Sequence, residues 1–316
     1  MSRTERVALL IGGVGGAKLA VGLAAILPPE RLTIIVNTGD DFEHLSLHIS
    51  PDLDTVVYNL AGVANPETGW GLAGDTFHAM EMVGQRGGAG WFRLGDRDLG
   101  VNLLRADMLR SGKTLSEVTR HLAQSWNVQH PVLPMSDDPV RTWLETEQGE
   151  LGFQEYFVRE RWQPVVKRIV FKNAENARPT PEVLSALESA TLIVIGPSNP
   201  YLSIDPILAV PGVRDRIIEN PAPCVAVSPI VGGQALKGPA AKLMSELDVA
   251  ASPDSLARHY DGILDGIIID TVDQSVVSEL ESRGTNAVAL NTIMQSLPDK
   301  VRLAQELLIW AKEHYL

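Results

Sequence analysis

A glycine-rich turn near the start of the chain has the residue types needed to bind an anion. The segment Gly12-Gly13-Val14-Gly15-Gly16-Ala17-Lys18 follows Val7–Ile11, an apolar run typical of a buried strand. Glycines let backbone N–H groups approach a ligand, and a helix that begins there adds positive potential. A tight turn with close helix packing explains the same glycines. We predict phosphate contacts from Gly12, Gly13, Gly15, Gly16 and Lys18.

This turn departs from two common nucleotide-binding fingerprints. A dinucleotide motif would have glycine or alanine at Lys18. A P-loop would have glycine at Ala17 and serine or threonine at Leu19. The sequence therefore supports neither NAD binding nor the usual ATP-loop chemistry.

Acidic residues follow a second apolar run, Leu32–Asn37. Asp40-Asp41 comes directly after this run, and Ser50-Pro51-Asp52-Leu53-Asp54 comes soon after. Carboxylates at strand ends supply the oxygen ligands of Mg²⁺, which binds one or two carboxylates together with substrate phosphates. Asp52 could equally cap the helix that follows it. Two further acidic segments have simpler explanations than metal binding or catalysis. In 94–98 the arginine between two acids suits a local ion pair, and 133–139 suits an ordinary β-turn.

Polar residues also follow two later apolar runs. Ser198 and Asn199 come after 192–195, and Ser228 comes after 224–227, with Lys237 nearby. Hydroxyl and amide groups at adjacent strand ends can bind a diphosphate, whose charge a lysine would neutralise. The alternative interpretation is that these segments are simply Pro-rich turns without a ligand. The histidines lack metal-binding spacing, and no Gly-x-Ser-x-Gly elbow occurs, which disfavours covalent nucleophilic catalysis.

Apolar runs alternate with helical patterns along most of the chain. This alternation predicts an α/β protein with a Rossmann-like, doubly wound, mostly parallel sheet, whose ligands lie at the carboxyl ends of the strands. A helix is expected over 18–27 and another over 103–110. We assign 1–69 and 163–316 to the core, and 70–162 to an inserted cap of helices with a β-hairpin, strands 141–147 and 151–159, turning at Gln148-Gly149-Glu150.

Composition narrows the possible partners. The 316 residues include 27 Lys plus Arg and 39 Asp plus Glu, for a net charge of −12, which argues against nucleic-acid binding. The single cysteine, Cys224, indicates a reduced cytoplasm. No export signal is expected at the polar N-terminus, and no apolar run is long enough for a membrane span.

An ordered set of motifs resembles the 2-phospho-L-lactate transferase family of coenzyme F-420 biosynthesis. The resemblance runs from the N-terminus to about Met244, so it covers most of the chain. Its motifs are GGVGGAKLAVGL, VNTGDDFEHLSLHISPDLDTVVYNL, WGLAGDTF, RLGDRD, LPMSDDPV, FQEYFVR, IGPSNPYLSIDPILAVPG and SPIVGGQALKGPAAKLM.

The resemblance implies a reaction. A guanosine diphosphate ester of a small phosphorylated acid gives its phospho-acyl group to the terminal ribityl hydroxyl of the deazaflavin Fo, and GMP leaves with help from Mg²⁺. By position, Asp54 and Arg93 match the Fo-binding residues, although some family members have another residue in place of Arg93. Asp40 and Asp54 are the expected metal ligands and catalytic residues, with Asp54 the first candidate for general base.

The sequence leaves several alternatives open. The acid could be 2-phospholactate, phosphoenolpyruvate or 3-phosphoglycerate, since no motif distinguishes them. A sugar-nucleotide transferase or nucleotidyltransferase would also use paired acids and Mg²⁺. A related non-enzymatic group that binds a nucleotide or phospho-sugar would lack the Fo-contacting residues. A homodimer is expected from the family.

Overall fold

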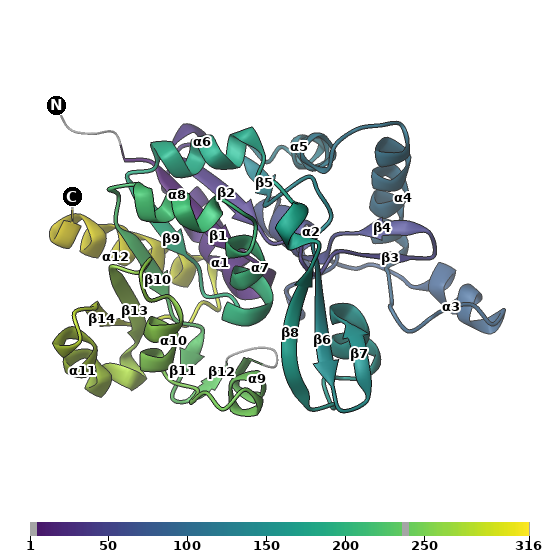
Figure 1. The fold of residues 1–316 in the computed structure, drawn as a ribbon. Helices are drawn as coiled ribbons and strands as arrows, with labels where there is room; N and C mark the ends of the chain where they lie inside the picture. Colours follow the sequence, from purple (N-terminus) through teal and green to yellow (C-terminus); the bar gives the residue numbers. More distant parts are fainter. Residues whose placement is uncertain (1–4, 236–239, 316) are drawn as a thin grey trace.

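The computed structural model of the chain describes residues 5–235 and 240–315. A seven-stranded sheet runs through its centre, and every neighbouring pair of strands in it is parallel (Figure 1). In spatial order its strands are β14 (Asn286–Leu290), β13 (Gly266–Asp270), β10 (Cys224–Val227), β9 (Leu192–Ile195), β1 (Val7–Ile11), β2 (Leu32–Val36) and β5 (Val132–Pro134). The predicted Rossmann-like α/β fold is confirmed.

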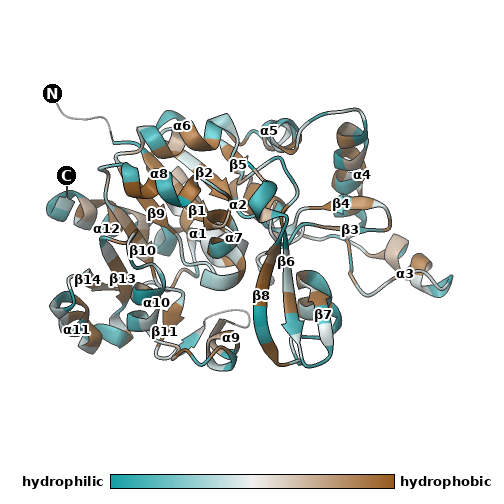
Figure 2. Ribbon diagram, viewed as in Figure 1, coloured by the Kyte–Doolittle hydropathy of each residue, from teal (hydrophilic) through white to brown (hydrophobic). Residues whose placement is uncertain are grey.

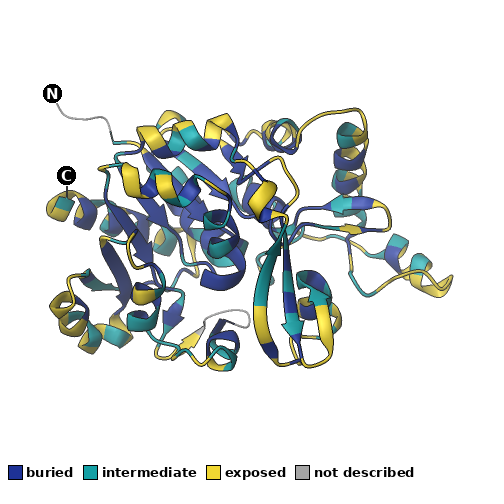
Figure 3. Ribbon diagram, viewed as in Figure 1, coloured by how far each residue is buried: buried dark blue, intermediate teal, exposed yellow. Residues whose placement is uncertain are grey.

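Helices cover both faces of this sheet because its strands are apolar on both sides. Along β1, Leu9 and Ile11 pack into one hydrophobic cluster, while Ala8 and Leu10 pack into another. In Figure 2 the strands of the central sheet are largely hydrophobic, and in Figure 3 they are buried, whereas exposed positions occur on the surrounding helices. The first cluster includes side chains of α1 (Gly13–Ala24), α2 (Pro51–Leu60), α5 (Leu115–Ser125) and α12 (Leu297–Tyr315). The second includes those of α6 (Pro181–Ser189), α7 (Asp205–Leu208), α8 (Val213–Glu219), α10 (Pro253–His259) and α11 (Val277–Ser282).

Smaller antiparallel sheets extend from the core. Strand β6 (Arg141–Thr146) lies between β7 (Gly149–Gly152) and β8 (Val166–Lys172), which confirms the predicted hairpin, with its turn at 147–148 rather than 148–150. The other two sheets pair β3 (Phe42–His44) with β4 (Leu47–Ile49), and β11 (Ile230–Val231) with β12 (Gln234–Ala235). The remaining helices are η1 (Pro29–Arg31), α3 (His78–Gln85), α4 (Asp96–Arg110), η2 (Glu155–Arg159), η3 (Ala174–Asn176), η4 (Pro200–Ile204), α9 (Ala240–Glu246) and η5 (Thr271–Val276).

Three predicted boundaries were wrong. Helix α1 begins at Gly13 rather than Lys18, so most of the glycine-rich turn is itself helical. Helix α4 begins at Asp96 rather than Leu103, with two aspartates in its first turn, where negative charge is favoured. The second hairpin strand does not extend over 151–159, because β7 ends at Gly152 and a π-helical segment follows.

The division into core and inserted cap stays a prediction. Residues 70–162 include α3, α4 and α5, which lie beside the sheet in Figure 1. The same range includes β5, which pairs with β2 in the central sheet, and β6, whose partner β8 lies beyond residue 162. None of the helices in the described ranges combines the length and the apolarity of a membrane span.

Candidate active site

Three of the predicted phosphate-binding residues, Gly12, Gly16 and Ser198, lie together at the point where the strand order of the sheet reverses. The chain proceeds from β1 through β2 to β5 on one side, and from β9 outward on the other, so the switch point lies between β1 and β9. Ser198, after β9, accepts a hydrogen bond at Oγ from Gly12 N–H (3.0 Å) and donates one to Gly12 O (2.8 Å). A Cβ at Gly16 would lie 2.6 Å from Ser198 Oγ. The glycines therefore allow α1 to pack closely on the turn after β9.

A buried asparagine joins two of the acidic residues. Asn37, at the end of β2, donates from Nδ2 to Asp40 Oδ1 and to Asp52 Oδ2, at 3.0 Å each. The Gly39 N–H donates to Asn37 Oδ1 (2.7 Å), which fixes the orientation of the amide. Gln154 Nε2 reaches the other oxygen of Asp40 at 3.3 Å. Asn37 therefore holds Asp40 and Asp52 beside the same amide nitrogen.

The Asp52 carboxylate lies against the start of α1 rather than capping its own helix. Ser50 occupies the N-cap position of α2, and Asp52 falls in the first turn. The backbone N–H of Gly13 hydrogen-bonds the Asp52 carboxylate. A Cβ at Gly12 would overlap Asp52 Oδ2 and lie 2.8 Å from Ser203 Cβ. The turn that we predicted to bind phosphate thus contacts an internal carboxylate.

The Asp54 side chain has a different environment, although it lies in the same turn of α2. Its Oδ1 forms a buried ion pair with Arg105 of α4. The contacts of Asp54 do not include Asp40, whose hydrogen bonds lead to Asn37 and Gln154. Asp52, rather than Asp54, is thus the acidic residue that the structure brings beside Asp40.

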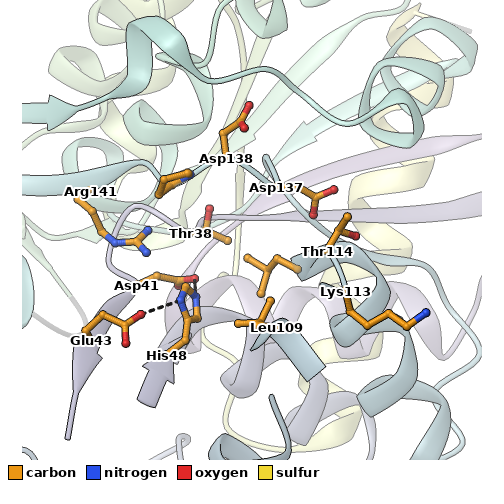
Figure 4. A pocket seen from close by; sticks show the side chains of 12 residues that line it. Thr38, Asp41, Glu43, His48, Leu109, Lys113, Thr114, Asp137, Asp138 and Arg141 are labelled. Atoms are coloured by element: carbon orange, nitrogen blue, oxygen red, sulfur yellow. Dashed lines mark hydrogen bonds and ion pairs between the residues drawn. The ribbon is translucent and has the colours of Figure 1, made fainter. Parts of the chain in front are cut away.

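Asp41 lines a pocket of about 360 Å³ next to these residues (Figure 4). Its Oδ2 accepts hydrogen bonds from His48 Nε2 (3.0 Å) and Ser50 Oγ (2.8 Å). Its Oδ1 is buried without a hydrogen-bond partner, as is Thr38 Oγ1, which also lines the pocket. The Arg141 side chain extends toward both residues in Figure 4. The pocket therefore has two polar oxygen atoms without hydrogen-bond partners, near the guanidinium group of Arg141.

Burial raises the pKa of several of these carboxyl groups. Desolvation raises the pKa of Asp40 well above its ordinary value, and the nearby Asp52 and Asp41 charges raise it further. Desolvation brings the pKa of Asp52 to about 6, against the hydrogen bonds from Asn37 and Gly13. It also raises the pKa of Asp54, which the Arg105 charge opposes. Grouped acids of this kind attract a proton or a cation.

Several predicted phosphate-binding side chains have partners within the fold. Lys18 Nζ donates to Met294 O (2.7 Å), and Asn199 Oδ1 accepts from the backbone of Tyr201 (3.0 Å) and of Leu202 (3.2 Å) at the start of η4. Ser228 Oγ bonds both backbone groups of Ile230 (3.1 Å each). Lys237 lies outside the described residues. Phosphate binding by these residues stays a prediction.

Arg93, the second predicted Fo contact, is exposed and lies over the Phe77 ring, with 4.3 Å from its guanidinium carbon to the ring centroid. Just before it, Trp91 and Phe92 pack edge to face, with centroids 5.7 Å apart. Phe42 of β3 contacts both rings. The structure thus places Arg93 beside an aromatic cluster, apart from the contacts of Asp54.

The roles of Asn37 and Arg105 were not predicted from the sequence. A signal for Arg105 existed: Asp98, Asn102 and Arg105 recur at the spacing of one helix face. An acid, an amide and an arginine on one face of a helix indicate a candidate for a buried polar contact. No local pattern marks Asn37, because its partners come from three separate segments.

The acidic residues suit Mg²⁺ on chemical grounds. Within the described ranges, no three His, Cys, Asp or Glu side chains are arranged to hold a metal on their own. Mg²⁺ needs only one or two protein carboxylates, with water and substrate phosphates completing its shell. The hard oxygen donors and the unpartnered Asp41 Oδ1 meet that requirement.

A family model for the 2-phospho-L-lactate transferase CofD matches residues 7–306. The chain belongs to this family. It is 43% identical to a phosphoenolpyruvate transferase of Streptomyces griseus subsp. griseus over 98% of the chain and 99% of that relative. It is 37% identical to a 2-phospho-L-lactate transferase of Methanosarcina mazei over 93% of the chain and 96% of that relative. The predicted family is confirmed, and the chain is a CofD-family transferase.

A solved structure shares the fold. A member of the UPF0052 family from Bacillus halodurans superposes with a TM-score of 0.65. The two chains are 20% identical over 98% of this chain and 100% of the other. At this identity the likeness shows the fold alone.

Proposed function

We propose that this CofD-family transferase moves a phosphoenolpyruvyl group from its guanosine diphosphate ester to the terminal ribityl hydroxyl of Fo, releasing GMP. The relatives that are 40–43% identical over 98% of the chain carry the name phosphoenolpyruvate transferase. Those named 2-phospho-L-lactate transferase are 36–37% identical. This difference favours phosphoenolpyruvate over 2-phospholactate and 3-phosphoglycerate.

The reaction needs orientation and charge compensation more than covalent help. The ribityl oxygen bonds to the phosphorus that carries the acid, and the bond from that phosphorus to the GMP oxygen breaks. The hydroxyl proton passes to a carboxylate, for which Asp54 is the first candidate. The observation that carries this assignment is that Arg105 holds the Asp54 carboxylate through Oδ1, while 11% of the side chain stays exposed.

Mg²⁺ is the proposed cofactor, with Asp40 as its first ligand. Asp54 is the second ligand expected from the sequence, and Asp52 is the alternative that the structure brings beside Asp40. When bound, the ion would neutralise phosphate charge. Asn37 and Gln154 keep the Asp40 carboxylate in place by hydrogen bonds to both of its oxygens.

The two substrates would bind different parts of the molecule. The aromatic residues near Arg93 offer ring faces and edges against which the deazaflavin rings would pack. The strand ends at the β1–β9 switch point, with Gly12, Ser198 and Asn199, would receive the guanosine diphosphate part. We also propose a homodimer in the cytoplasm, with no nucleic-acid partner.

The decisive experiment is mass spectrometry of the product made from Fo with each of three guanylylated donors, carrying phosphoenolpyruvate, 2-phospholactate or 3-phosphoglycerate. The phosphoenolpyruvyl donor should give the highest kcat/KM, with GMP released in equal amount. Preference for another donor would change the identity of the transferred acid and leave the rest of the proposed reaction intact. No product from any donor would remove the proposed reaction.

A further inference from the structure

Arg105 is unusual because an arginine is completely enclosed within the protein. Its side chain is 2% exposed, and its guanidinium donates to Asp54 Oδ1 and, from the other terminal nitrogen, to Asn102 Oδ1 (2.5 Å). Asn102 in turn donates to the Asp98 carbonyl oxygen one helical turn earlier (2.9 Å). Removing a guanidinium from water costs several kcal/mol unless its hydrogen bonds are well made. Arg105 is therefore held in one orientation.

Only one oxygen of the Asp54 carboxylate takes part in this contact. Arg105 bonds Oδ1, and among the described residues no donor reaches Oδ2. The Asp54 side chain remains 11% exposed, whereas that of Arg105 is 2% exposed. The pair is therefore enclosed on α4 and slightly exposed at the carboxylate, where Oδ2 has room to accept a hydrogen bond from a ligand hydroxyl.

A second contact fixes the same two helices. Tyr58 lies one turn after Asp54 on α2, and its hydroxyl donates to Asp98 Oδ1 (2.6 Å) on α4. Tyr58 is buried and packs edge to face on Trp126, with ring centroids 5.0 Å apart. Two polar contacts one helical turn apart thus prevent α2 from rotating relative to α4.

We propose that Arg105 is a positioning residue that holds Asp54 Oδ1 so that Oδ2 faces the ribityl hydroxyl of the acceptor. This inference rests on the proposed function, because it assigns the hydroxyl to that site. A purely stabilising role explains the pair poorly, since well-packed apolar residues usually stabilise a protein as well as a buried ion pair does. What the ion pair adds is a fixed direction for one carboxylate.

A double-mutant cycle tests this proposal with Arg105→Met, Asp54→Asn and the combined variant. The readouts are the Kd for Fo from optical titration, the Kd for GDP from calorimetry, and the acceptor KM and kcat. Each single substitution should weaken Fo binding about tenfold or more, and the double variant should lose no more than about threefold beyond the worse single variant. GDP binding should change less than about threefold, because Arg105 acts through Asp54.

Two further variants calibrate the cycle. Arg105→Lys keeps the charge but not the two-pronged geometry, so it should recover part of the Fo affinity that Arg105→Met loses. Arg110→Met removes an exposed arginine from the same helix, whose guanidinium donates to Ser46 O at the surface. It should leave Fo binding and turnover unchanged.

Additive losses in the double variant would overturn the proposal, as would a folded Arg105→Met protein whose Fo affinity stays within twofold of wild type. Should Arg105→Met fail to fold, Asn102→Ala replaces it, because it removes the second partner of Arg105, together with the Asn102 contacts to Asp98, and leaves the guanidinium and Asp54 in place. That variant should weaken Fo binding about threefold to tenfold, and unchanged binding would also overturn the proposal. Wild-type protein that does not bind Fo would reject the proposed function itself, and this inference with it.

Discussion

Asp52 and Gly13 are joined by a hydrogen bond in which the backbone N–H at the first residue of α1 donates to the Asp52 carboxylate. An internal negative charge thus lies at the positive end of the helix that follows β1. A phosphate approaching the same turn would be repelled by Asp52 unless a proton or a cation lay between them. Binding of an anion and of a cation at this place should therefore depend on each other.

Replacing Gly12 with alanine should destabilise the protein by about 1–3 kcal/mol, because the added methyl group would overlap Asp52 Oδ2 and crowd Ser203. Urea unfolding monitored by circular dichroism measures the effect. Gly100→Ala is the matched control, since Gly100 lies in α4 with nothing within 4 Å of an added Cβ. It should stabilise the protein by up to about 1 kcal/mol. Equal effects at the two glycines would contradict the close approach at Gly12.

Stability without metal should fall as pH rises from about 4 to about 7. Burial raises the pKa of Asp98 to about 7 and that of Asp52 to about 6, so the folded state binds protons more tightly than the unfolded chain in this range. Deprotonation above these values then favours unfolding.

Asp98→Asn removes one of these groups, while its amide oxygen can still accept from Tyr58. At pH 8 it should raise the free energy of unfolding by about 1–3 kcal/mol, and the gain should vanish near pH 4. Urea titrations across this range, in buffer containing a chelator, measure both. A variant less stable than wild type at pH 8 would show that the ionised carboxylate is needed.

Asp40→Asn and Asp54→Asn should each lower turnover by about two orders of magnitude or more while leaving the fold intact, because loss of a metal ligand or base removes several kcal/mol of transition-state stabilisation. Initial rates at limiting Mg²⁺ are the measurement. Asp52→Asn in the same series decides which residue is the second ligand. Wild-type rates in Asp40→Asn and Asp54→Asn at limiting Mg²⁺ would refute their assignment.

GDP should stabilise the protein against heat, whereas NAD should not. A ligand that binds only the folded state stabilises it by about 2.7 kcal/mol at one hundred times its Kd. NAD should not bind because Lys18 departs from the dinucleotide-binding motif. Ala17 and Leu19 likewise depart from the P-loop motif. Melting temperatures at matched nucleotide concentrations test it, and equal increases with both nucleotides would speak against a guanosine donor.

Arg93→Ala should weaken Fo binding about threefold to thirtyfold and leave GDP binding nearly unchanged, because Arg93 lies beside the aromatic cluster and not at the β1–β9 switch point. Asn199→Ala should have the opposite selectivity, with some loss of stability, since Asn199 also caps η4. Calorimetric titration of both ligands into both variants makes the comparison. Equal losses of Fo and GDP affinity in Arg93→Ala, or no loss of either, would show that the substrates do not bind in this way.

Local sequence alone determined the strands and some of the turns. The runs Val7–Ile11 and Leu192–Ile195 are apolar at every position, and both became strands buried on two sides. Thr114 and Glu117 had the spacing of a capping box, and both of its hydrogen bonds are present at the start of α5. The ordered motifs were also sufficient to predict the family.

Only the tertiary structure decided which acidic residues lie together. Asp52 and Asp54 are two residues apart, so they point in different directions from α2, one toward α1 and the other toward Arg105, 51 positions later in the chain. The direction in which each aspartate points, and the residue that it contacts, depend on how α2 packs between α1 and α4. No local sequence pattern predicts that packing. The glycines after β1 became packing positions for the same reason. A side chain at these positions would collide with Asp52, Pro197 or Ser198, and it is the sheet topology that places those residues next to the glycines.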